Sequence, residues 1–234
     1  MKALILAAGL GTRLAPLTDE LPKSLVPVNG KPILFQQIDC LRACGIEDIT
    51  VVSGYKADVM EAAVKEAYDG IRVIENADYA NTNNMYSAWL GVKELAGAPF
   101  LMMNADVFFD QSVVEALLAF EATNAVVVDM GRWMAESMKV TEADGRLVHI
   151  SKEITAEEAL GCSIDLYKFG VDGGLAFQER CRAFIEDKGE LGMWSEVALD
   201  DALADVTFKA CPLEGRWFEI DSLEDLAEAE ALFS

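Results

Sequence analysis

Short apolar runs alternate with amphipathic segments along the first half of the chain. Residues 2–8, 46–53 and 71–75 are apolar runs, each long enough for one buried strand. Residues 32–44 and 56–68 place apolar side chains at helical spacing, and a glycine follows each within two residues, as is typical of a helix end. This order predicts a parallel α/β sheet, in which ligands bind beyond the carboxyl ends of the strands.

The second half of the chain predicts further strands and helices around a hairpin. We expect the hairpin at residues 139–150, because Asp144-Gly145 is a favoured hairpin turn. The other elements follow the same rules of spacing. Strands are expected at 100–103, 125–129, 161–169 and 206–210, and helices at 88–95, 111–122, 175–187 and 193–203, with an acidic helix ending at 232. Together they predict a single α/β domain over residues 1–234.

Candidate chemistry is concentrated in the loop that follows the first strand. Gly9 and Gly11 lie there, followed by Arg13 and Lys23. Glycine allows a sharp turn and lets a ligand approach backbone N–H groups, which act as partial positive charges. Arg offers a planar fork to phosphate oxygens and Lys a compact point charge. The loop therefore suits a polyphosphate, although glycines in isolation could simply turn the chain.

Two standard phosphate motifs are excluded in this loop. A P-loop would need Gly-Lys-Ser/Thr after four intervening residues, and a dinucleotide fingerprint would need a glycine where Leu14 stands. The longer run nevertheless resembles the signature of the nucleotidyltransferases that activate sugar phosphates and related phosphomonoesters. The matching residues are Gly9-Leu10-Gly11-Thr12-Arg13-Leu14-x-Pro16-Leu17-Thr18 and Pro22-Lys23-x-Leu25-x-Pro27-Val28.

The resemblance implies a Rossmann-like, mostly parallel sheet flanked by helices, of the nucleotide-diphospho-sugar transferase type. It also implies that a nucleoside triphosphate is condensed with a phosphorylated small molecule and that pyrophosphate is released. Arg13 and Lys23 would be the catalytic cations. By the same resemblance, residues 1–106 form the nucleotide-binding part, with contacts from Leu6, Ala8, Gly9, Gly11, Thr12, Gly54, Asn83 and Asn84.

The polar segment 76–87 narrows the resemblance to one branch of the family. Its Asn-x-x-Tyr-x-x-x-Asn-Asn-x-Tyr-Ser pattern is similar to that of bacterial phosphocholine cytidylyltransferases, with Asn83, Asn84 and Ser87 matching best. These side chains could read a nucleobase or hold a substrate. They could also cap the helix that follows, because Ser, Thr and Asn are preferred at helix N-termini.

Two aspartates are candidate ligands for Mg²⁺. Asp106 follows the strand at 100–103, and Asp221 belongs to a Glu219-x-Asp221 segment that closes the active site in the family. Magnesium prefers a few carboxylates together with phosphates and water. Asp221-Ser222-x-x-Asp225 could also be a helix N-cap, and the two roles are compatible.

Residues 107–234 are expected to bind the acceptor and to close the site. By resemblance Lys152 would hold the acceptor phosphate, with Ser87 nearby; the alternative is an exposed loop lysine. Trp194 with Glu196 and Asp200 combines an aromatic face with carboxylates, which suits a quaternary ammonium. The same pattern fits an acidic amphipathic helix with one buried tryptophan. Aromatic candidates for a cage around such a group are Trp133, Trp194, Tyr86 and Phe218.

Composition limits the remaining function classes. The formal net charge of −21 argues against a nucleic-acid-binding or anionic-membrane surface. Residues 1–31 are the exception, with a net charge of about +2, which fits a focused anion site. The longest apolar runs are too short to span a membrane. The single histidine, His149, is expected to be structural.

The cysteines predict a reducing compartment. Their number is odd and no metal-binding spacing recurs, so we expect reduced thiols in a cytoplasmic protein. They are Cys40, Cys44, Cys162, Cys181 and Cys211.

The expected function is a Mg²⁺-dependent cytidylyltransferase. It would condense CTP with phosphocholine, or with phosphoethanolamine or 2-aminoethylphosphonate, and release pyrophosphate. One alternative is a sugar- or polyol-phosphate nucleotidyltransferase that uses UTP or CTP. Another is a catalytically silent relative that binds nucleotide and acts through protein contacts. The sequence does not determine the oligomeric state.

Overall fold

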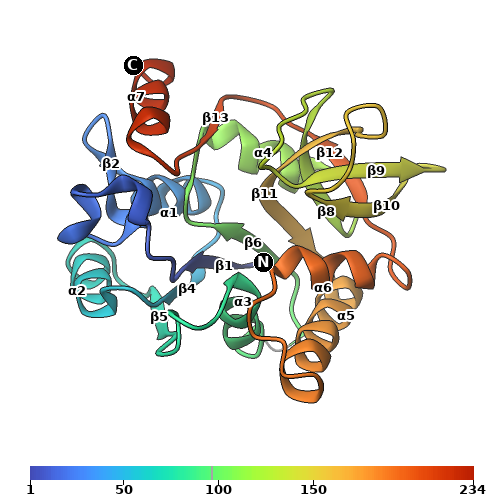
Figure 1. Ribbon diagram of the computed structural model, residues 1–234, viewed down its shortest axis with the longest axis horizontal. Helices are drawn as coiled ribbons and strands as arrows, with labels where there is room; N and C mark the ends of the chain where they lie inside the picture. The colour runs from blue at the N-terminus through green and yellow to red at the C-terminus, as the bar shows by residue number, and fades with distance from the viewer. Residues whose placement is uncertain (96) are drawn as a thin grey trace.

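Strand β1 (Lys2–Ala7) runs through the middle of a mixed sheet (Figure 1). The computed structural model describes residues 1–95 and 97–234. Strand β4 (Asp48–Ser53) pairs with one edge of β1 and β6 (Phe100–Asn104) with the other, and β5 (Arg72–Glu75) extends the sheet beyond β4. These four strands are parallel, so their carboxyl ends lie at one edge of the sheet. The chain changes winding direction between β1 and β6, which is where such folds bind ligands.

The other part of the sheet contains the antiparallel pairs. Strand β11 (Gly161–Phe169) pairs antiparallel with β6 and with β8 (Ala125–Met130). Strand β12 (Lys209–Pro212) lies parallel to β8. The expected hairpin is present as β9 (Lys139–Ala143) and β10 (Arg146–Ser151).

Helices cover both faces of the sheet, and β1 contributes side chains to each face. Its alternate residues Ala3, Ile5 and Ala7 pack into a core cluster with helices α1 (Ile33–Ala43), α2 (Ala57–Ala67) and α4 (Gln111–Ala119). Leu4 and Leu6 face a second cluster with α3 (Asn84–Val92), α5 (Val171–Arg182) and α6 (Ser195–Ala202). Burial on both faces explains why β1 is a continuous apolar run. The α/β fold expected from the sequence is confirmed.

The C-terminal segment returns to the start of the chain. Strand β13 (Trp217–Glu219) pairs with β7 (Val107–Phe109), and helix α7 (Leu223–Leu232) packs beside β2 (Pro27–Val28), which pairs with β3 (Lys31–Pro32) (Figure 1). The segment beyond residue 216 therefore lies against the loop from Gly9 to Lys23, called the glycine loop below, although about 200 positions separate the two segments in the sequence.

Some boundaries differ from those expected. Helix α3 begins at Asn84, four residues early, because the Asn83 side chain caps it and its first turn is polar. Helix α5 begins at Val171, four residues before the expected start. Gly173 and Gly174 lower helix propensity, but they lie in its first turn and pack closely against Asn124 and Phe100. Strand β12 begins at Lys209, three residues late.

No described helix is long and apolar enough to cross a lipid bilayer. The cysteines are free, as expected: Cys40, Cys162, Cys181 and Cys211 are buried and Cys44 is half-buried. The compartment stays a prediction.

Candidate active site

Two adjoining cavities lie beyond the carboxyl ends of β1 and β6. The larger encloses about 290 Å³ and the smaller about 220 Å³. They share Leu6, Gly9, Asp106 and Asp221 in their walls. The smaller cavity is walled by the glycine loop, and the larger extends towards β11 and the start of α6. Both cavities therefore lie at the edge of the sheet where the sequence predicts ligand binding.

The backbone of the glycine loop packs closely against the Lys23 side chain at Gly11. Gly11 has a φ of 63°, in the left-handed region, and a Cβ there would lie 2.7 Å from Lys23 Cβ. The Thr18 hydroxyl donates to the Gly11 carbonyl at 2.9 Å and closes the turn. Gly11 is thus required both by backbone conformation and by the close approach of the lysine.

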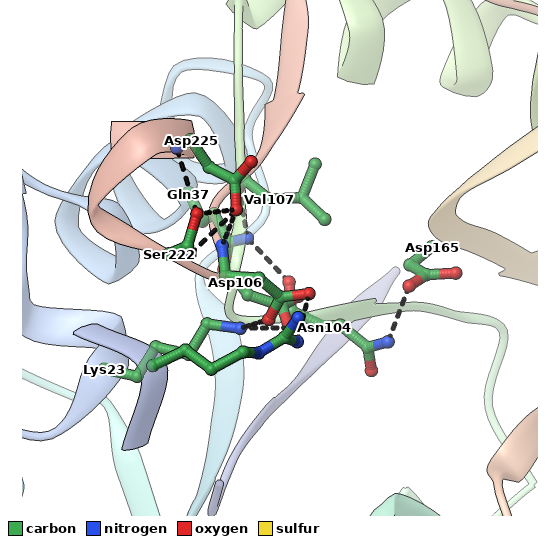
Figure 2. A network of polar contacts seen from close by, with 10 residues as sticks. Lys23, Gln37, Asn104, Asp106, Val107, Asp165, Ser222 and Asp225 are labelled. Atoms are coloured by element: carbon green, nitrogen blue, oxygen red, sulfur yellow. Dashed lines mark hydrogen bonds and ion pairs between the residues drawn. The ribbon is translucent and has the colours of Figure 1, made fainter. Parts of the chain in front are cut away.

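The Lys23 ammonium joins two distant carboxylates. It lies 2.9 Å from Asp106 Oδ2 and 2.5 Å from Asp221 Oδ1. Arg13 Nη2 contacts the other oxygen of Asp221 at 2.8 Å. Figure 2 shows Lys23 directed at Asp106 at the end of β6. The four residues expected to be catalytic cations and metal ligands therefore meet at the junction of the cavities, and they come from three separate segments.

Polar contacts behind these carboxylates fix their positions. The Gln37 amide, from α1, donates to the carbonyls of Asn104 and Val107 at 2.9 and 2.8 Å and so holds the turn that carries Asp106 (Figure 2). On the other side, Ser222 and Asp225 form a capping box at the start of α7, and Asp225 also accepts from the Asp221 N–H at 3.1 Å. Capping and presentation of Asp221 coexist, as the sequence allowed.

A third carboxylate completes a possible metal site. Asp106, Glu219 and Asp221 each place a carboxylate oxygen within 4.8 Å of the others. Asp106 Oδ1 is buried and has no hydrogen-bond partner among residues 1–95 and 97–234. Because three carboxylates form an all-oxygen donor set, these residues fit Mg²⁺. Glu219 was not assigned as a ligand from the sequence, although its spacing of two from Asp221 places both on one side of an extended segment.

The charges at this junction shift the pKa of Asp221, Glu219 and Lys23. Burial alone would raise the pKa of Asp221, but Lys23 and Arg13 outweigh it and lower the pKa below its usual range. Burial, with repulsion from Asp106 and Asp221, raises the pKa of Glu219 to about 7. Burial would lower the pKa of Lys23, but the two aspartates raise it above its usual value. Lys23 is therefore a permanent cation.

Most residues expected to bind nucleotide line the cavities. The larger cavity is lined by Leu6, Ala8, Gly9, Asn83 and Asn84, and the smaller by Gly11 and Thr12. Gly54 lies outside both. It packs behind Ala8, where a Cβ would be 2.8 Å from the Ala8 Cβ and 2.7 Å from that of Tyr79. The structure thus gives Gly54 a packing role under the loop instead of a place in the cavity wall.

The polar segment 76–87, called the asparagine segment below, forms hydrogen bonds within its own loop and also lines the larger cavity. The Asn83 side chain accepts from the Asn84 N–H at the start of α3. Asn84 Oδ1 accepts from the Ser195 N–H at 2.8 Å, which ties α3 to α6. Asn76 Nδ2 donates to the hydroxyls of Thr82 and Ser87. The segment therefore caps the helix and also lines the larger cavity, so the two alternatives that the sequence left open are compatible.

The residues expected to bind the acceptor divide into two groups. Lys152, Ser87, Trp194 and Glu196 line the larger cavity. Asp200 lies outside it, because its Oδ1 accepts from the Ile150 N–H at 2.8 Å and contacts the His149 ring at 2.7 Å. This pairing gives His149 the structural role expected for it.

The aromatic candidates do not form a cage. Phe218 packs in the cluster beneath α7 and Tyr86 packs against the cluster that contains α3. Trp133 lines a separate cavity whose wall also includes Trp194. Trp194 is half-exposed, not buried, and the Lys152 ammonium lies 4.8 Å from its ring centroid.

Several polar side chains in the larger cavity were not singled out from the sequence. Ser163 and Asp165 stand two apart in the mostly apolar strand β11, and that spacing is the signal that could have indicated them. Two others, Glu136 and Ser137, come from the loop before β9.

Comparison with known proteins now identifies the family. A model described as MobA-like NTP transferase domain matches residues 3–161, which is more than half of the chain. The chain belongs to the MobA-like NTP transferase family. The nucleotidyltransferase resemblance noted from the sequence is thereby confirmed, and the matched residues include the glycine loop, Lys23 and Asp106.

Individual relatives and solved structures give a finer comparison. The choline-phosphate cytidylyltransferase of Streptococcus pneumoniae is 49% identical over 98 residues, which cover 42% of each protein. The CTP:phosphoglutamine cytidylyltransferase of Campylobacter jejuni is 30% identical, over 97% of this chain and 98% of that protein. The solved structure of the CTP:phosphocholine cytidylyltransferase from S. pneumoniae aligns with a TM-score of 0.81 at 27% identity, covering 100% of this chain and 99% of that one.

Proposed function

We propose that this MobA-like NTP transferase is a Mg²⁺-dependent cytidylyltransferase. It condenses CTP with a small phosphorylated amine and releases pyrophosphate. The observation that carries the proposal is the meeting of Arg13, Lys23, Asp106 and Asp221 at the junction of two cavities, one on the glycine loop and one reaching Lys152. The two relatives described above, both cytidylyltransferases by name, support the choice of CTP.

In the proposed reaction, an acceptor phosphate oxygen forms a bond to the α-phosphorus of CTP. The bond from that phosphorus to the oxygen shared with the pyrophosphate breaks. A phosphate monoester is largely ionised near pH 7, so no general base is needed. The protein's task is to hold two anions together and to neutralise the negative charge of the transition state.

The residues divide this task by position. The N–H groups of the glycine loop and the guanidinium of Arg13 bind the triphosphate in the smaller cavity. Lys23 keeps a full positive charge at the junction, where charge develops during transfer. Lys152, in the wall of the larger cavity, binds the acceptor phosphate.

Asp106, Glu219 and Asp221 would hold the Mg²⁺ ion. The ion supplies positive charge to triphosphate oxygens when it is bound. The carboxylates themselves are held ready by Gln37 and by the Ser222–Asp225 capping box.

The residues proposed to bind nucleotide and those proposed to bind the acceptor come largely from different parts of the chain. Residues 1–106 supply the glycine loop, the asparagine segment and Asp106. Residues 107–234 supply Lys152, Glu196 and the closing Glu219–Asp221 segment. Base contacts would come from Ala8, Gly9, Asn83 and Asn84, which share the wall of the larger cavity.

Pyrophosphate release tests the proposal. We would assay the full chain with Mg²⁺ over a grid of the four nucleoside triphosphates and several acceptors. The panel contains phosphocholine, phosphoethanolamine, 2-aminoethylphosphonate, glucose 1-phosphate and inositol phosphate. Turnover with CTP and an amine is the expected result. Turnover with sugar phosphates alone would show that the acceptor is a sugar phosphate and not a phosphorylated amine. Nucleotide binding without turnover would contradict the proposal that the protein is an enzyme.

A further inference from the structure

A second pair of carboxylates, one buried and one half-buried, lies in the wall of the larger cavity and is distinct from the proposed metal ligands. Asp165 comes from β11 and Glu196 from the first turn of α6. Asn104 donates to Asp165 Oδ2 at 2.9 Å from the end of β6, and Figure 2 shows Asp165 facing Asn104. Glu196 is only 3% exposed, although it belongs to the cavity wall. Glu196 is therefore buried and Asp165 half-buried, and both belong to the cavity wall.

The backbone directs Asp165 to this position. Its φ is 58°, in the left-handed region, at an irregularity in the pairing of β11 with β8 between Ser163 and Tyr167. Asp and Asn tolerate this conformation better than other residues with a side chain. Asn would therefore keep the local fold and remove only the carboxyl group.

Hydrogen bonds from the protein leave this pair incompletely satisfied. The Tyr167 hydroxyl lies 3.0 Å from Asp165 Oδ1 and 2.9 Å from Glu196 Oε1, but it has a single proton to donate. Ser195 also donates to Glu196 Oε1 at 3.1 Å, whereas Glu196 Oε2 has no partner in the described part of the chain. Burial and the charge of Glu196 raise the pKa of Asp165 well above its usual value. The pair therefore lacks a donor at Glu196 Oε2, shares a single tyrosine proton between its two members, and has no cation in contact with it among the residues that the structure describes.

The aromatic side chains of the same cavity are poorly suited to a quaternary ammonium. They are Tyr79, Trp194 and Trp217. The Lys152 ammonium lies over the Trp194 ring, and the Arg132 guanidinium lies 5.3 Å from the Trp217 ring centroid. Tyr79 packs edge-on against Tyr55. A trimethylammonium group at either tryptophan would meet a protein cation, and it has no N–H to offer the carboxylates.

We propose that Asp165 and Glu196 bind a primary ammonium group of the acceptor, so that the enzyme selects N–H-bearing phosphorylated amines over trimethylammonium compounds. A primary ammonium offers three N–H donors and one positive charge, which is what the pair lacks. Lys152 would bind the phosphate of the same molecule elsewhere in the cavity wall. This inference rests on the proposed function and specifies its acceptor.

The test compares kcat/KM for three acceptors of graded chemistry with CTP and Mg²⁺. Phosphoethanolamine carries the primary ammonium, phosphocholine the trimethylammonium, and ethyl phosphate no charge at that end. In the wild-type protein we expect phosphoethanolamine to exceed both by at least about tenfold, because charge-assisted hydrogen bonds form with it alone.

Variants of Asp165 and Glu196 test whether these two carboxylates cause the preference for phosphoethanolamine. Glu196→Gln and Asp165→Asn keep the shape of each side chain, and each should lower the ratio of kcat/KM for phosphoethanolamine over ethyl phosphate by about tenfold or more, mainly through KM. Asp201→Asn is the control on the same helix, because Asp201 pairs with Arg180 away from the cavity. It should leave that ratio as in the wild type.

The outcomes separate this inference from the proposed function. Turnover with CTP that favours phosphocholine over phosphoethanolamine would overturn the ammonium assignment and leave the proposed function standing. Unchanged ratios in both carboxamide variants would also overturn it. If no acceptor is turned over, the proposed function fails. Calorimetry with the two amines then decides the inference, since tighter binding of phosphoethanolamine supports it and tighter binding of phosphocholine contradicts it.

Discussion

The two ends of the larger cavity handle negative charge in opposite ways. At the junction with the smaller cavity, Asp106 and Asp221 are paired with Lys23 and Arg13, so the protein supplies the counter-charge itself. At the far end, Asp165 and Glu196 share one tyrosine hydroxyl and have no cation of the protein in contact with them in the described structure. The compensated end suits groups that must stay fixed in the absence of ligand, and the uncompensated end suits a ligand that brings its own charge.

The largest expected effect comes from removing the cation of the compensated end. Lys23→Ala should lower kcat for pyrophosphate release by about 100-fold or more, because a charge partner of the transition state is lost, and Asp106→Ala should have a similar effect, because a ligand of the proposed Mg²⁺ ion is lost. Steady-state rates with saturating CTP measure this. Lys31→Ala is the control, since Lys31 pairs with Asp39 outside both cavities. Near-normal turnover of Lys23→Ala would contradict the role given to the junction.

A substitution at Gly11, which packs against Lys23, tests the position of the lysine without removing its charge. Gly11→Ala would bring a methyl group within 2.7 Å of Lys23 Cβ, so we expect kcat to fall by about tenfold as the ammonium is displaced. Gly30→Ala is a matched control, because Gly30 also has a positive φ but nothing lies within 4 Å of its added Cβ. Equal losses of activity in the two variants would point to backbone strain instead of displacement of Lys23.

The third carboxylate tests the metal assignment. Glu219→Gln should raise the Mg²⁺ concentration needed for half-maximal rate several-fold, because a neutral amide binds the ion more weakly than a carboxylate. Titration of the rate with Mg²⁺ at saturating CTP measures the change. Glu214→Gln, which changes a carboxylate outside both cavities, should leave the titration unchanged. An unchanged midpoint in Glu219→Gln would remove Glu219 from the ligand set.

The smallest effect concerns the pH dependence of stability at the uncompensated end. The pKa of Asp165 in the folded chain is raised above its unfolded value, so the folded state binds the proton more tightly. The free energy of unfolding therefore falls as pH rises from the unfolded pKa through the folded one. Asp165→Asn lacks this loss, so its stability relative to wild type should increase between about pH 5 and about pH 8. Urea unfolding without ligand measures the difference, and a difference that shrinks with pH would contradict the raised pKa.

The same comparison explains what the sequence could predict. The compensated end is carried largely by one continuous run, and the pattern from Gly9 to Lys23 indicates its chemistry directly. The parallel strands follow from apolar runs and glycine stops. Asp221 could be placed only through the resemblance, because its contact with Lys23 spans 198 positions.

The uncompensated end could not be predicted in this way. Asp165 is a single acidic residue in a strand, and its direction depends on an irregularity in strand pairing that local pattern does not encode. Asp200 and Glu196 lie on one short helix, and only tertiary packing decides that one faces the cavity and the other faces His149. Gly54 likewise had the position of a site residue but is used for packing against Ala8.

The stoichiometry of the reaction tests the central claim most directly. Wild-type protein would be incubated with CTP, Mg²⁺ and phosphoethanolamine, and CTP, pyrophosphate and cytidine products would be quantified together. The account predicts that pyrophosphate and a cytidine-containing phosphodiester or diphosphate of the amine form in equal amounts as CTP is consumed. Release of inorganic phosphate from CTP without that product, or no consumption of CTP with any acceptor, would contradict it.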